Sequence, residues 1–508
     1  MGAVSAIPKY EAVADRVQAM IDNGVYEPGE RLPSIRELHH QLGVSMNTVR
    51  EAYRVLESRG VAEAISQSGH FVRQGPPICL DSDIHTAGID CAGRPQEVTP
   101  DSLTRRAMRD AASARVDLFS TEPPADRLPT RRITDSTVRM LRRDPERAVS
   151  YDFPDGPEEL RQAIAKRLFR GGLTVRTDDV LITAGCVEAV FLALTTVCEP
   201  GDAVIVESPA FFLFYQLLRQ LGLRAVEVPS RCCEGLDVAA LEYALATGAA
   251  GNGIGGGAGG TRVRAALLIG NFTNPMGALI PDENKRRIAD LLSAHGVYLI
   301  EDDMYGELHY GPSRPRSIAS FADPDLSFLA ASFSKTIAPG YRIGWLAARG
   351  GLIDRARHTK LVTSVVSSKP AALGIADFLE TGSYDRTLRA ARTRYAENVV
   401  RLRQAVFESF PAGTTSTRPE GGMMFWVALP PGVDVLELYE AARAEGIVFA
   451  PGPMFSLRDT FRNGLRIGAV RWDASIDRGI RRLGALATAA AAAAQRGTRP
   501  NERAAPAV

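Results

Sequence analysis

The chain has 508 residues, of which 45% are hydrophobic and 23% are charged, and its formal net charge is +1. This length allows two or more separately packed cores, and the near-neutral charge excludes an overall field that would draw the whole protein onto nucleic acid. The sequence shows no apolar signal-peptide core and no run of about 18 apolar residues, so we expect a soluble cytoplasmic protein without a membrane span.

The cysteines show no metal-binding pattern. None of the six lies in the CxxC spacing that is typical of a zinc site, and a chain of this length needs no disulfides to fold. We therefore expect reduced thiols and no metal site. The six are Cys79, Cys91, Cys186, Cys198, Cys232 and Cys233.

Changes in composition divide the chain into four parts. Residues 8 to 75 contain many residues that are typical of helix starts and helix ends. Residues 76 to 114 contain Pro, Gly and Asp without a regular spacing of apolar residues, which indicates a linker. Apolar strand candidates alternate with helical patterns over residues 115 to 487, and residues 488 to 508 end in a polar, proline-containing tail. A glycine-rich stretch at 247 to 262 predicts a flexible surface insertion.

The first part predicts two helices joined by a short turn. In "GERLPSIRELHHQLGVSMNTVREAYRVLESRG", Ser34 and Glu37 have the spacing of a capping box, and Gly43 ends the first helix. A second helix is expected from about Met46 to Arg59. Its buried stripe would consist of Val49, Tyr53 and Leu56.

Polar residues stand at the start of this second helix, where a recognition helix meets base edges. The following "VAEAISQSGHFV" predicts two short strands around Gly69, which would form a wing. These motifs resemble the winged helix-turn-helix of the GntR superfamily of bacterial regulators. The resemblance implies DNA contacts by Arg36, Ser45, Asn47, Thr48, Arg50 and Gly69.

Two features of this part limit DNA binding. Met46 stands where the family commonly has arginine, and residues 1 to 75 have one more acidic than basic side chain. We therefore expect weak binding by one copy and a dimer that recognises paired half-sites of double-stranded DNA. The alternative is a small interaction domain that has lost DNA binding.

Five short apolar segments of the third part predict strands, and helical patterns separate them. This alternation is typical of crossover units, so we expect an α/β domain with a mainly parallel sheet flanked by helices. The segments are 179 to 185, 202 to 209, 264 to 271, 297 to 302 and 326 to 333.

Polar and aromatic residues follow these predicted strands. Gly185 and Cys186 open a helix, whose first backbone N–H groups suit a phosphate. Phe211 offers an aromatic ring for stacking, or is an ordinary core residue. Asn274, which precedes a proline, offers an amide donor, and Tyr305 offers a phenol.

A carboxylate also stands at the end of one predicted strand. Asp302 can pair with a protonated ring nitrogen, although Glu301 and Asp303 are rivals that differ only in spacing. The segment "SFSKTIAPGYRIGW" then combines a lysine with phosphate-binding groups. These are Ser332, Ser334, Lys335 and Arg342. Together the five motifs provide what a pyridoxal 5'-phosphate site requires.

These motifs resemble the class I and II aminotransferases, which are fold-type I pyridoxal phosphate enzymes, from about residue 115 to 487. The resemblance implies that Lys335 is the catalytic, cofactor-bearing lysine, that Tyr151 reaches the phosphate of the neighbouring subunit, and that Arg466 binds a substrate or effector α-carboxylate. "NFTNPMG" departs from the commoner "NxQNPTG", and Phe211 replaces a frequent tyrosine.

A GntR-type domain followed by an aminotransferase-like domain resembles the MocR subfamily of transcriptional regulators. This resemblance implies a head-to-tail homodimer whose large domain senses pyridoxal phosphate and, in some members, a small amino compound. We therefore expect a regulator in which ligands at Lys335 change operator binding. The alternatives are an active aminotransferase with an accessory head, a regulator of pyridoxal phosphate supply, and a domain that has lost its cofactor.

Overall fold

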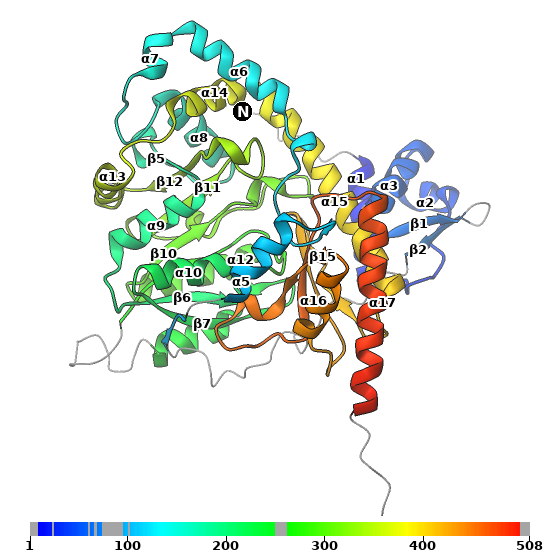
Figure 1. Cartoon of the computed structure of the whole chain (residues 1–508). Helices are drawn as coiled ribbons and strands as arrows, with labels where there is room; N and C mark the ends of the chain where they lie inside the picture. The colour runs from blue at the N-terminus through cyan, green and yellow to red at the C-terminus, as the bar shows by residue number, and fades with distance from the viewer. Residues whose placement is uncertain are drawn as a thin grey trace, which may run out of the picture.

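A computed structural model describes residues 9–22, 25–58, 61–65, 69–73, 95–99, 102–248 and 262–497. Within these residues no helix is long and apolar enough to cross a membrane, and no group of three or more His, Cys, Asp or Glu side chains is placed to hold a metal ion. The chain forms a small N-terminal head and a large α/β domain with a C-terminal subdomain (Figure 1).

The head is a helix-turn-helix with a two-stranded wing. Ser34 caps the second helix in the expected capping box with Glu37, and Gly43 ends that helix in the left-handed conformation at φ 61°. The expected stripe of the recognition helix is confirmed, because Val49, Tyr53 and Leu56 are all 1% exposed or less. The elements are α1 (Lys9–Asp22), α2 (Ile35–Leu42), α3 (Met46–Ser58), β1 (Ala62–Ile65) and β2 (Gly69–Val72).

A nine-stranded sheet forms the centre of the large domain. Its order is β3-β7-β6-β9-β10-β11-β12-β5, with β8 paired to β7. The neighbours from β7 to β11 are parallel, and β12 is antiparallel to both β11 and β5. The strands are β3 (Gln96–Glu97), β5 (Val180–Thr183), β6 (Ala203–Ser208), β7 (Arg224–Arg231), β8 (Gly235–Leu236), β9 (Val263–Leu268), β10 (Tyr298–Asp302), β11 (Ser327–Ser332) and β12 (Gly344–Ala348).

The five strands that the sequence predicted are β5, β6, β9, β10 and β11, which confirms a mainly parallel α/β fold. Both faces of the sheet are buried, because Ile205 packs in one apolar cluster while its neighbours Val204 and Val206 pack in another. Helices cover both faces (Figure 1). The helices of the large domain are α6 (Thr130–Arg143), α7 (Pro145–Val149), α8 (Glu158–Arg170), α9 (Cys186–Val197), α10 (Phe212–Gln220), α11 (Val238–Tyr243), α12 (Asp282–Ala294), α13 (Gly351–Thr363) and α14 (Lys369–Glu380). Helix α5 (Ser102–Ala112) packs against the C-terminal core instead.

The C-terminal subdomain has its own antiparallel sheet, in the order β13-β14-β17-β16, and its own apolar core. Helix α15 extends for 27 residues from the large domain into this subdomain. The elements are β4 (Val116–Asp117), α15 (Ser383–Ser409), β13 (Thr415–Ser416), β14 (Met424–Ala428), α16 (Val435–Ala444), β15 (Ile447–Val448), β16 (Ala450–Pro451), β17 (Gly464–Gly468) and α17 (Ala474–Gly497).

The structure changes two expected boundaries. The second half of the expected linker belongs to the large body of the protein, because β3 pairs with β7 and α5 buries Ala107 in the C-terminal core. The expected tail begins inside α17, which runs to Gly497. Most of the glycine-rich stretch, residues 249–261, and the chain after 497 lie outside the described residues, as do residues 76–94 of the linker.

The head lies beside the C-terminal subdomain (Figure 1). The hydrogen bond from Gln404 lowers the pKa of Glu408 near the end of α15, and the positive charges of Arg481 and of Arg73, at the end of the wing, lower it further. The charge of Arg73 in the head therefore acts on a side chain of α15.

Candidate functional site

The head presents most of its expected DNA-contacting residues to solvent. Arg36, Asn47 and Arg50 are exposed, and Arg50 Nη1 donates a hydrogen bond to Asn47 Oδ1 at 2.9 Å. The Ser45 hydroxyl accepts from the Thr48 backbone N–H at 3.1 Å and lies 2.8 Å from the Thr48 hydroxyl. These two hydroxyls therefore also stabilise the start of the recognition helix.

Glycine is required at the wing. Gly69 begins β2 with φ 108°, and a Cβ atom at this position would lie 3.3 Å from Arg31 Nε. This backbone conformation is one that side chains with a Cβ rarely adopt. Gly69 therefore begins the second strand of the wing in a conformation that favours glycine, with the Arg31 guanidinium beside it.

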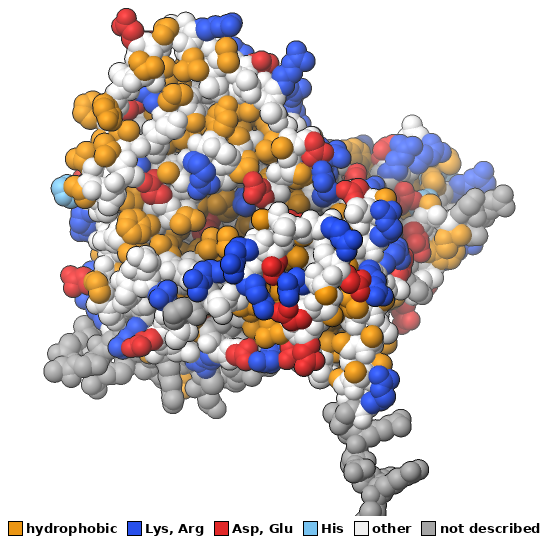
Figure 2. Space-filling view, viewed as in Figure 1, with side chains coloured by type: hydrophobic (Ala, Val, Ile, Leu, Met, Phe, Trp, Pro, Cys, Tyr) orange, Lys and Arg blue, Asp and Glu red, His pale blue; other side chains and the backbone are white. Residues whose placement is uncertain are grey.

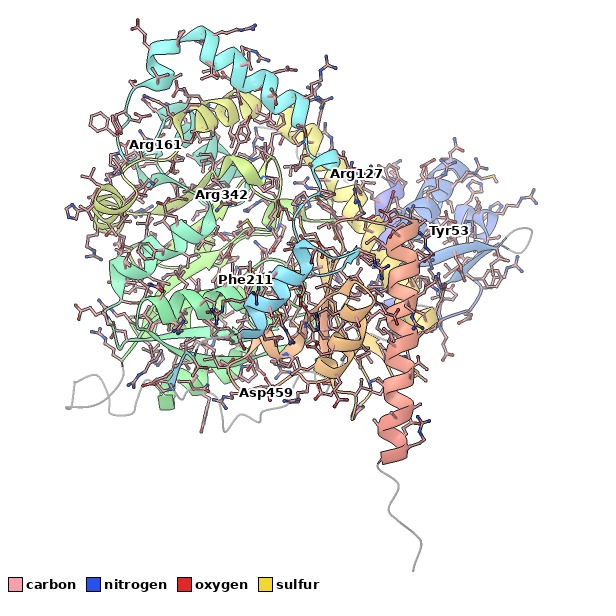
Figure 3. All side chains as sticks on the ribbon, in the orientation of Figure 1. Tyr53, Arg127, Arg161, Phe211, Arg342 and Asp459 are labelled. Carbon is pink, nitrogen blue, oxygen red and sulfur yellow. The ribbon has the colours of Figure 1, made fainter. Side chains whose placement is uncertain are left out.

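The expected cofactor residues of the large domain come together because parallel strands place their carboxyl ends at one edge of the sheet. Gly185 and Cys186 follow β5, Asp302 ends β10, and Lys335 follows β11. Figure 3 shows Phe211 and Arg342 within this domain, and it shows Tyr53 in the head, at the right of the view. Residues 150 positions apart in the sequence thus share one site.

An anion cradle lies at the start of α9. Gly185 has φ 91°, and a Cβ atom there would lie 2.5 Å from Nη2 of Arg342. Arg342 Nη2 donates to the Ala184 carbonyl at 3.0 Å, and its Nη1 donates to Ser334 Oγ at 3.4 Å. The unpaired N–H groups of the first helical turn, a serine hydroxyl and a guanidinium therefore face one place, which suits a phosphate dianion.

Lys335 lies beside this cradle. The pKa of its amine is lowered to about 8, mainly by burial and also by the positive charges of Arg466 and Arg342, against the opposing effect of the carboxylates of Glu122 and Asp302. An amine with such a pKa is partly neutral near physiological pH, which is the form that attacks an aldehyde. The Lys335 amine is therefore more nucleophilic near neutral pH than the amine of a solvated lysine.

Asp302 is the acid that faces the site. It is 5% exposed, and burial raises the pKa of its carboxyl to about 6. Its Oδ1 accepts from Cys186 Sγ at 3.3 Å and from the Met304 N–H at 3.0 Å. Both of these bonds use Oδ1, and Oδ2 accepts no hydrogen bond from the described residues.

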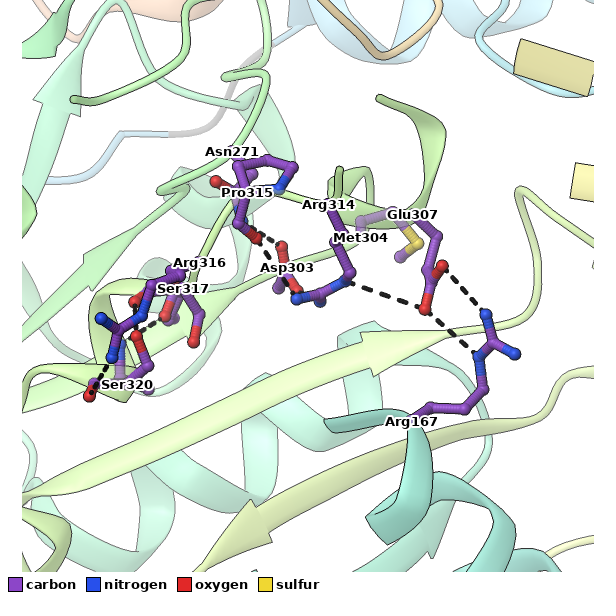
Figure 4. A network of polar contacts seen from close by, with 12 residues as sticks. Arg167, Asn271, Asp303, Met304, Glu307, Arg314, Pro315, Arg316, Ser317 and Ser320 are labelled. Carbon is purple, nitrogen blue, oxygen red and sulfur yellow. Dashed lines mark hydrogen bonds and ion pairs between the residues drawn. The ribbon is translucent and has the colours of Figure 1, made fainter. Parts of the chain in front are cut away.

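The rival acids are held elsewhere. Glu301 accepts from the backbone N–H groups of Ile318 and Ala319 at 2.9 and 2.8 Å. Asp303 accepts from Asn271 Nδ2 at 2.8 Å and forms an ion pair with Arg314, which belongs to the polar network of Figure 4. Both carboxylates therefore have structural partners, which supports the choice of Asp302.

Asn274 and Arg466 meet across the site. Arg466 Nη1 donates to Asn274 Oδ1 at 3.0 Å, and its Nη2 donates to the Phe119 carbonyl. Both residues are 1% exposed, and Asn274 Nδ2 and Arg466 Nε are buried without a hydrogen-bond partner within the described chain. Burial lowers the pKa of the Arg466 guanidinium to about 10. Such unpaired donors are costly, which indicates that a ligand completes them.

Of the two expected aromatic residues, Tyr305 lies close to Asn274, whereas Phe211 packs among apolar side chains. Burial raises the pKa of Tyr305 to about 12, and its phenol lies close to Thr121 and Asn274. Phe211 lies between two apolar clusters and contacts Phe214 edge to face at 5.5 Å, so a role as a core aromatic stays open.

Two expected residues do not reach the cradle of their own subunit. The Ser332 hydroxyl donates to Met304 Sδ at 3.3 Å and accepts from the Ser334 N–H at 3.1 Å, so its role at a phosphate rests on the resemblance. Tyr151 is 87% exposed on the surface. Its expected role is at a neighbouring subunit.

Sequence reasoning missed the segment after β4. Phe119 supplies the carbonyl to Arg466, Thr121 lies beside the phenol of Tyr305, and Glu122 has the largest effect of any charge on the pKa of Lys335. "DLFSTEPP" carries no motif, and only the fold brings this segment to the site. The proline after Glu122 was the one available signal of a turn.

Comparison with known proteins agrees with this arrangement. Residues 9–72 match the family of bacterial regulatory proteins named gntR, and residues 118–483 match the class I and II aminotransferases. The chain is 33% identical over 463 residues to the uncharacterized HTH-type transcriptional regulator YjiR of Escherichia coli, covering 90% of this chain and 94% of that protein. For YdcR of the same organism, described in the same words, the identity is 34% over 493 residues, with 94% and 98% covered.

A solved aminotransferase has the same fold as the large domain. The α-aminoadipate aminotransferase LysN of Thermus thermophilus, complexed with N-(5'-phosphopyridoxyl)-L-leucine, superposes with a TM-score of 0.69 at 27% identity, covering 78% of this chain and 97% of that chain. The chain therefore belongs to the MocR-type regulators, in which a GntR-type helix-turn-helix domain is joined to a class I and II aminotransferase domain whose cofactor is pyridoxal 5'-phosphate.

Proposed function

We propose that the protein is a pyridoxal phosphate-dependent transcriptional regulator in which the cofactor and a small amino compound, bound at Lys335, change its affinity for DNA. The observation that carries this proposal is the pair of buried, unpartnered donors, Asn274 Nδ2 and Arg466 Nε, in a chain that also has an exposed recognition helix. A domain without a ligand would leave both donors at a lasting energetic cost.

The residues fit the cofactor group by group. The bound cofactor supplies an aldehyde that combines with amines and a ring that withdraws electrons. The start of α9, Ser334 and Arg342 would hold the phosphate, and Asp302 would hold a proton on the ring nitrogen through its free Oδ2. Asn274 Nδ2 would donate to the phenolic oxygen, and the neutral amine of Lys335 would bond to the aldehyde carbon.

Arg466 gives the site a place for an amino acid. Its guanidinium is buried between the rings of Phe119 and Phe455, each 5.4 Å from its central carbon, and no carboxylate forms an ion pair with it among the described residues. The α-carboxylate of an amino compound would complete this site with two parallel hydrogen bonds. Such a ligand would replace water and neutralise a buried charge.

A homodimer completes the cofactor site. Apolar side chains lie exposed at the end of the large domain that carries α7 and α13, where Figure 2 shows them gathered on the surface. They are Val149, Tyr151, Phe153, Leu361, Val362 and Val365, with exposures of 86%, 87%, 79%, 48%, 67% and 44%. Burial of this surface against a second copy would bring Tyr151 to the partner's phosphate, and the two heads would then read paired half-sites.

Helix α15 gives a physical route between the site and the head. Its first turn holds Tyr384, whose hydroxyl donates to the Thr336 hydroxyl at 3.1 Å, next to Lys335. Its last turns hold Glu408, on which the charge of Arg73 acts. A shift of the lysine segment would therefore move a long helix that lies beside the head and on which a charge of the head acts (Figure 1).

The test is the affinity of the full-length protein for a DNA duplex selected from random sequence by the protein itself. We expect affinity to differ between the apo form, the cofactor-bound form and the form treated with an amino acid, while Lys335→Ala responds to neither ligand. Equal affinity in all three forms would contradict the proposal.

A second function, catalytic transamination, is favoured by Arg466, because a sensor of the cofactor alone needs no carboxylate site. Sustained conversion of a keto acid in the presence of an amino donor would establish an enzyme. A single half-reaction without turnover would establish a sensor of amino compounds. A response to the cofactor alone would instead support a regulator of pyridoxal phosphate supply.

A further inference from the structure

Two adjacent cysteines form the turn between β7 and β8. The Sγ atoms of Cys232 and Cys233 are 3.6 Å apart, both residues are partly exposed, and neither thiol is in a disulfide. Cys233 has φ 67°, a left-handed backbone conformation, and the short Sγ–Sγ distance shows that the two thiols lie together. The turn therefore presents a dithiol at the protein surface.

The surroundings favour a thiolate. The hydrogen bond with the Cys232 thiol lowers the pKa of Cys233 to about 7, and the Arg418 N–H and the positive charge of Arg403 add to this effect against the influence of burial. The charge interaction between Cys233 and Arg403 also acts on the arginine. Burial lowers the pKa of Arg403 to about 10, and the Cys233 thiolate opposes that shift. A thiol of this kind is a reactive nucleophile near neutral pH.

The spacing suits one atom bound to both sulfurs. Two sulfurs bonded at about 2.3 Å to one soft pyramidal atom, with an angle of about 100° between the bonds, are separated by about 3.5 Å, close to the 3.6 Å observed. A direct disulfide is less favoured, because adjacent Cα atoms are about 3.8 Å apart, whereas disulfide-bonded residues usually have Cα atoms about 4.4 to 6.8 Å apart.

A zinc ion does not fit this pair. Structural zinc takes four protein ligands, and the part of the chain that is described holds no group of three or more His, Cys, Asp or Glu side chains around one point. A ligand that suits this pair would instead be a soft centre that takes only two bonds from the protein.

We propose that Cys232 and Cys233 form a binding site for trivalent organoarsenicals of the type R–As=O. Each thiol loses its proton to the arsenical oxygen, two As–S bonds replace the As=O bond, and one water leaves, so the arsenic keeps its oxidation state. The first bond forms from the Cys233 thiolate, and the neighbouring Cys232 closes the ring.

This site is separate from the cofactor site but touches the same framework. A Cβ atom on Gly235, at the end of the turn, would lie 2.6 Å from Ile280 and 3.6 Å from Thr273, next to Asn274. Arg403 belongs to α15. The proposal nevertheless rests on the dithiol alone and stands whether or not the cofactor regulates DNA binding.

The test is intact-mass analysis of the full-length protein treated with phenylarsine oxide. We expect one adduct, with the mass of the reagent less one water, that is removed by an excess of 2,3-dimercaptopropanol but persists in the same concentration of thiol groups supplied as 2-mercaptoethanol. Cys232→Ser and Cys233→Ser should each lose this adduct, and Cys198→Ser, which changes a single half-buried thiol, should keep it.

A dithiol-reversible adduct in the double variant Cys232→Ser, Cys233→Ser, or an adduct that a monothiol removes, would overturn the proposal. A second measurement tests the electrostatic part without removing a thiol. Alkylation of Cys233 by iodoacetamide in Cys232→Ser and in the wild type should give pH midpoints that differ, with the wild-type midpoint near 7. Identical midpoints near that of a free thiol, about 8.5, would contradict it.

Discussion

Arg466 of β17 and Asn274 of the loop after β9 are joined by a hydrogen bond of 3.0 Å between Nη1 and Oδ1. This bond fixes the amide so that its NH₂ group, and not its carbonyl, is the unpaired side. The same bond helps to hold the Arg466 guanidinium in an orientation in which its Nε–H has no hydrogen-bond partner among the described residues. One contact therefore orients the donor for a phenolic oxygen and the donor for a carboxylate.

Substitution of Arg466 should weaken the binding of amino acids without weakening the binding of the cofactor. Arg466→Lys keeps a positive charge but lacks the planar pair of donors, so we expect cofactor binding to persist and affinity for amino acids to fall by at least tenfold. Titration of the visible absorbance with a panel of amino acids measures this. Arg471→Lys, at a site with the arginine about half exposed, should behave as the wild type. Equal amino acid affinity in all three proteins would exclude a carboxylate site at Arg466.

Glycine at position 185 should be required for phosphate binding. Gly185→Ala places a methyl group 2.5 Å from Arg342 Nη2 at φ 91°, so we expect lower stability and at least tenfold weaker cofactor binding. Gly201→Ala is the matched control, since φ is 97° and nothing lies within 4 Å of its Cβ. The control should lose about 1 to 3 kcal/mol of stability and keep its cofactor affinity. If both variants bind the cofactor equally well, the phosphate does not bind at the start of α9.

Cofactor capture should depend on pH through Lys335. Only the neutral amine attacks an aldehyde, and the pKa of about 8 means that the neutral fraction rises about tenfold per pH unit below pH 8 and then levels off. Stopped-flow absorbance of apo protein mixed with pyridoxal phosphate measures the rate. A rate that still climbs steeply at pH 10 would indicate an ordinary, solvated lysine. Lys335→Ala should give no lysine-dependent band.

The start of the recognition helix should determine DNA affinity. Arg50→Ala removes an exposed guanidinium that is oriented by Asn47, and we expect a loss of about 1 to 3 kcal/mol in binding. Fluorescence anisotropy with the selected duplex measures this loss. Arg54→Ala, on the same helix, removes an arginine that pairs with Glu51, and we expect a smaller effect. An Arg50→Ala variant with unchanged affinity would favour a head that does not bind DNA through this helix.

Dimer formation should be coupled to cofactor binding. Val362→Glu places a charge on the exposed apolar surface near α13, where the valine is 67% exposed, so it should not disturb the monomer fold. We expect sedimentation to show a shift towards monomer and cofactor affinity to fall as Tyr151 of the partner is lost. Tyr151→Phe should lower cofactor affinity without changing the sedimentation coefficient. A fully dimeric Val362→Glu protein would place the interface elsewhere.

The sequence alone determined the helix-turn-helix, five strands of the central sheet and the lysine segment. These features have local causes. Ser34 and Glu37 cap a helix within four residues, Gly43 ends it, and runs of apolar residues such as 203–208 form strands that are buried on both faces. Each of them is encoded in neighbouring residues, so patterns of spacing were sufficient.

The tertiary structure decided which polar groups are available. Glu301, Asp302 and Asp303 are chemically alike in sequence, and only the partners of Glu301 and Asp303 leave Asp302 for the site. The segment from Phe119 to Glu122 enters the site across more than 200 residues of chain, without any motif. Burial and hydrogen-bond partners depend on residues that are distant in sequence, and they set the pKa of Lys335 and the unpaired donors of Asn274 and Arg466 that no local pattern records.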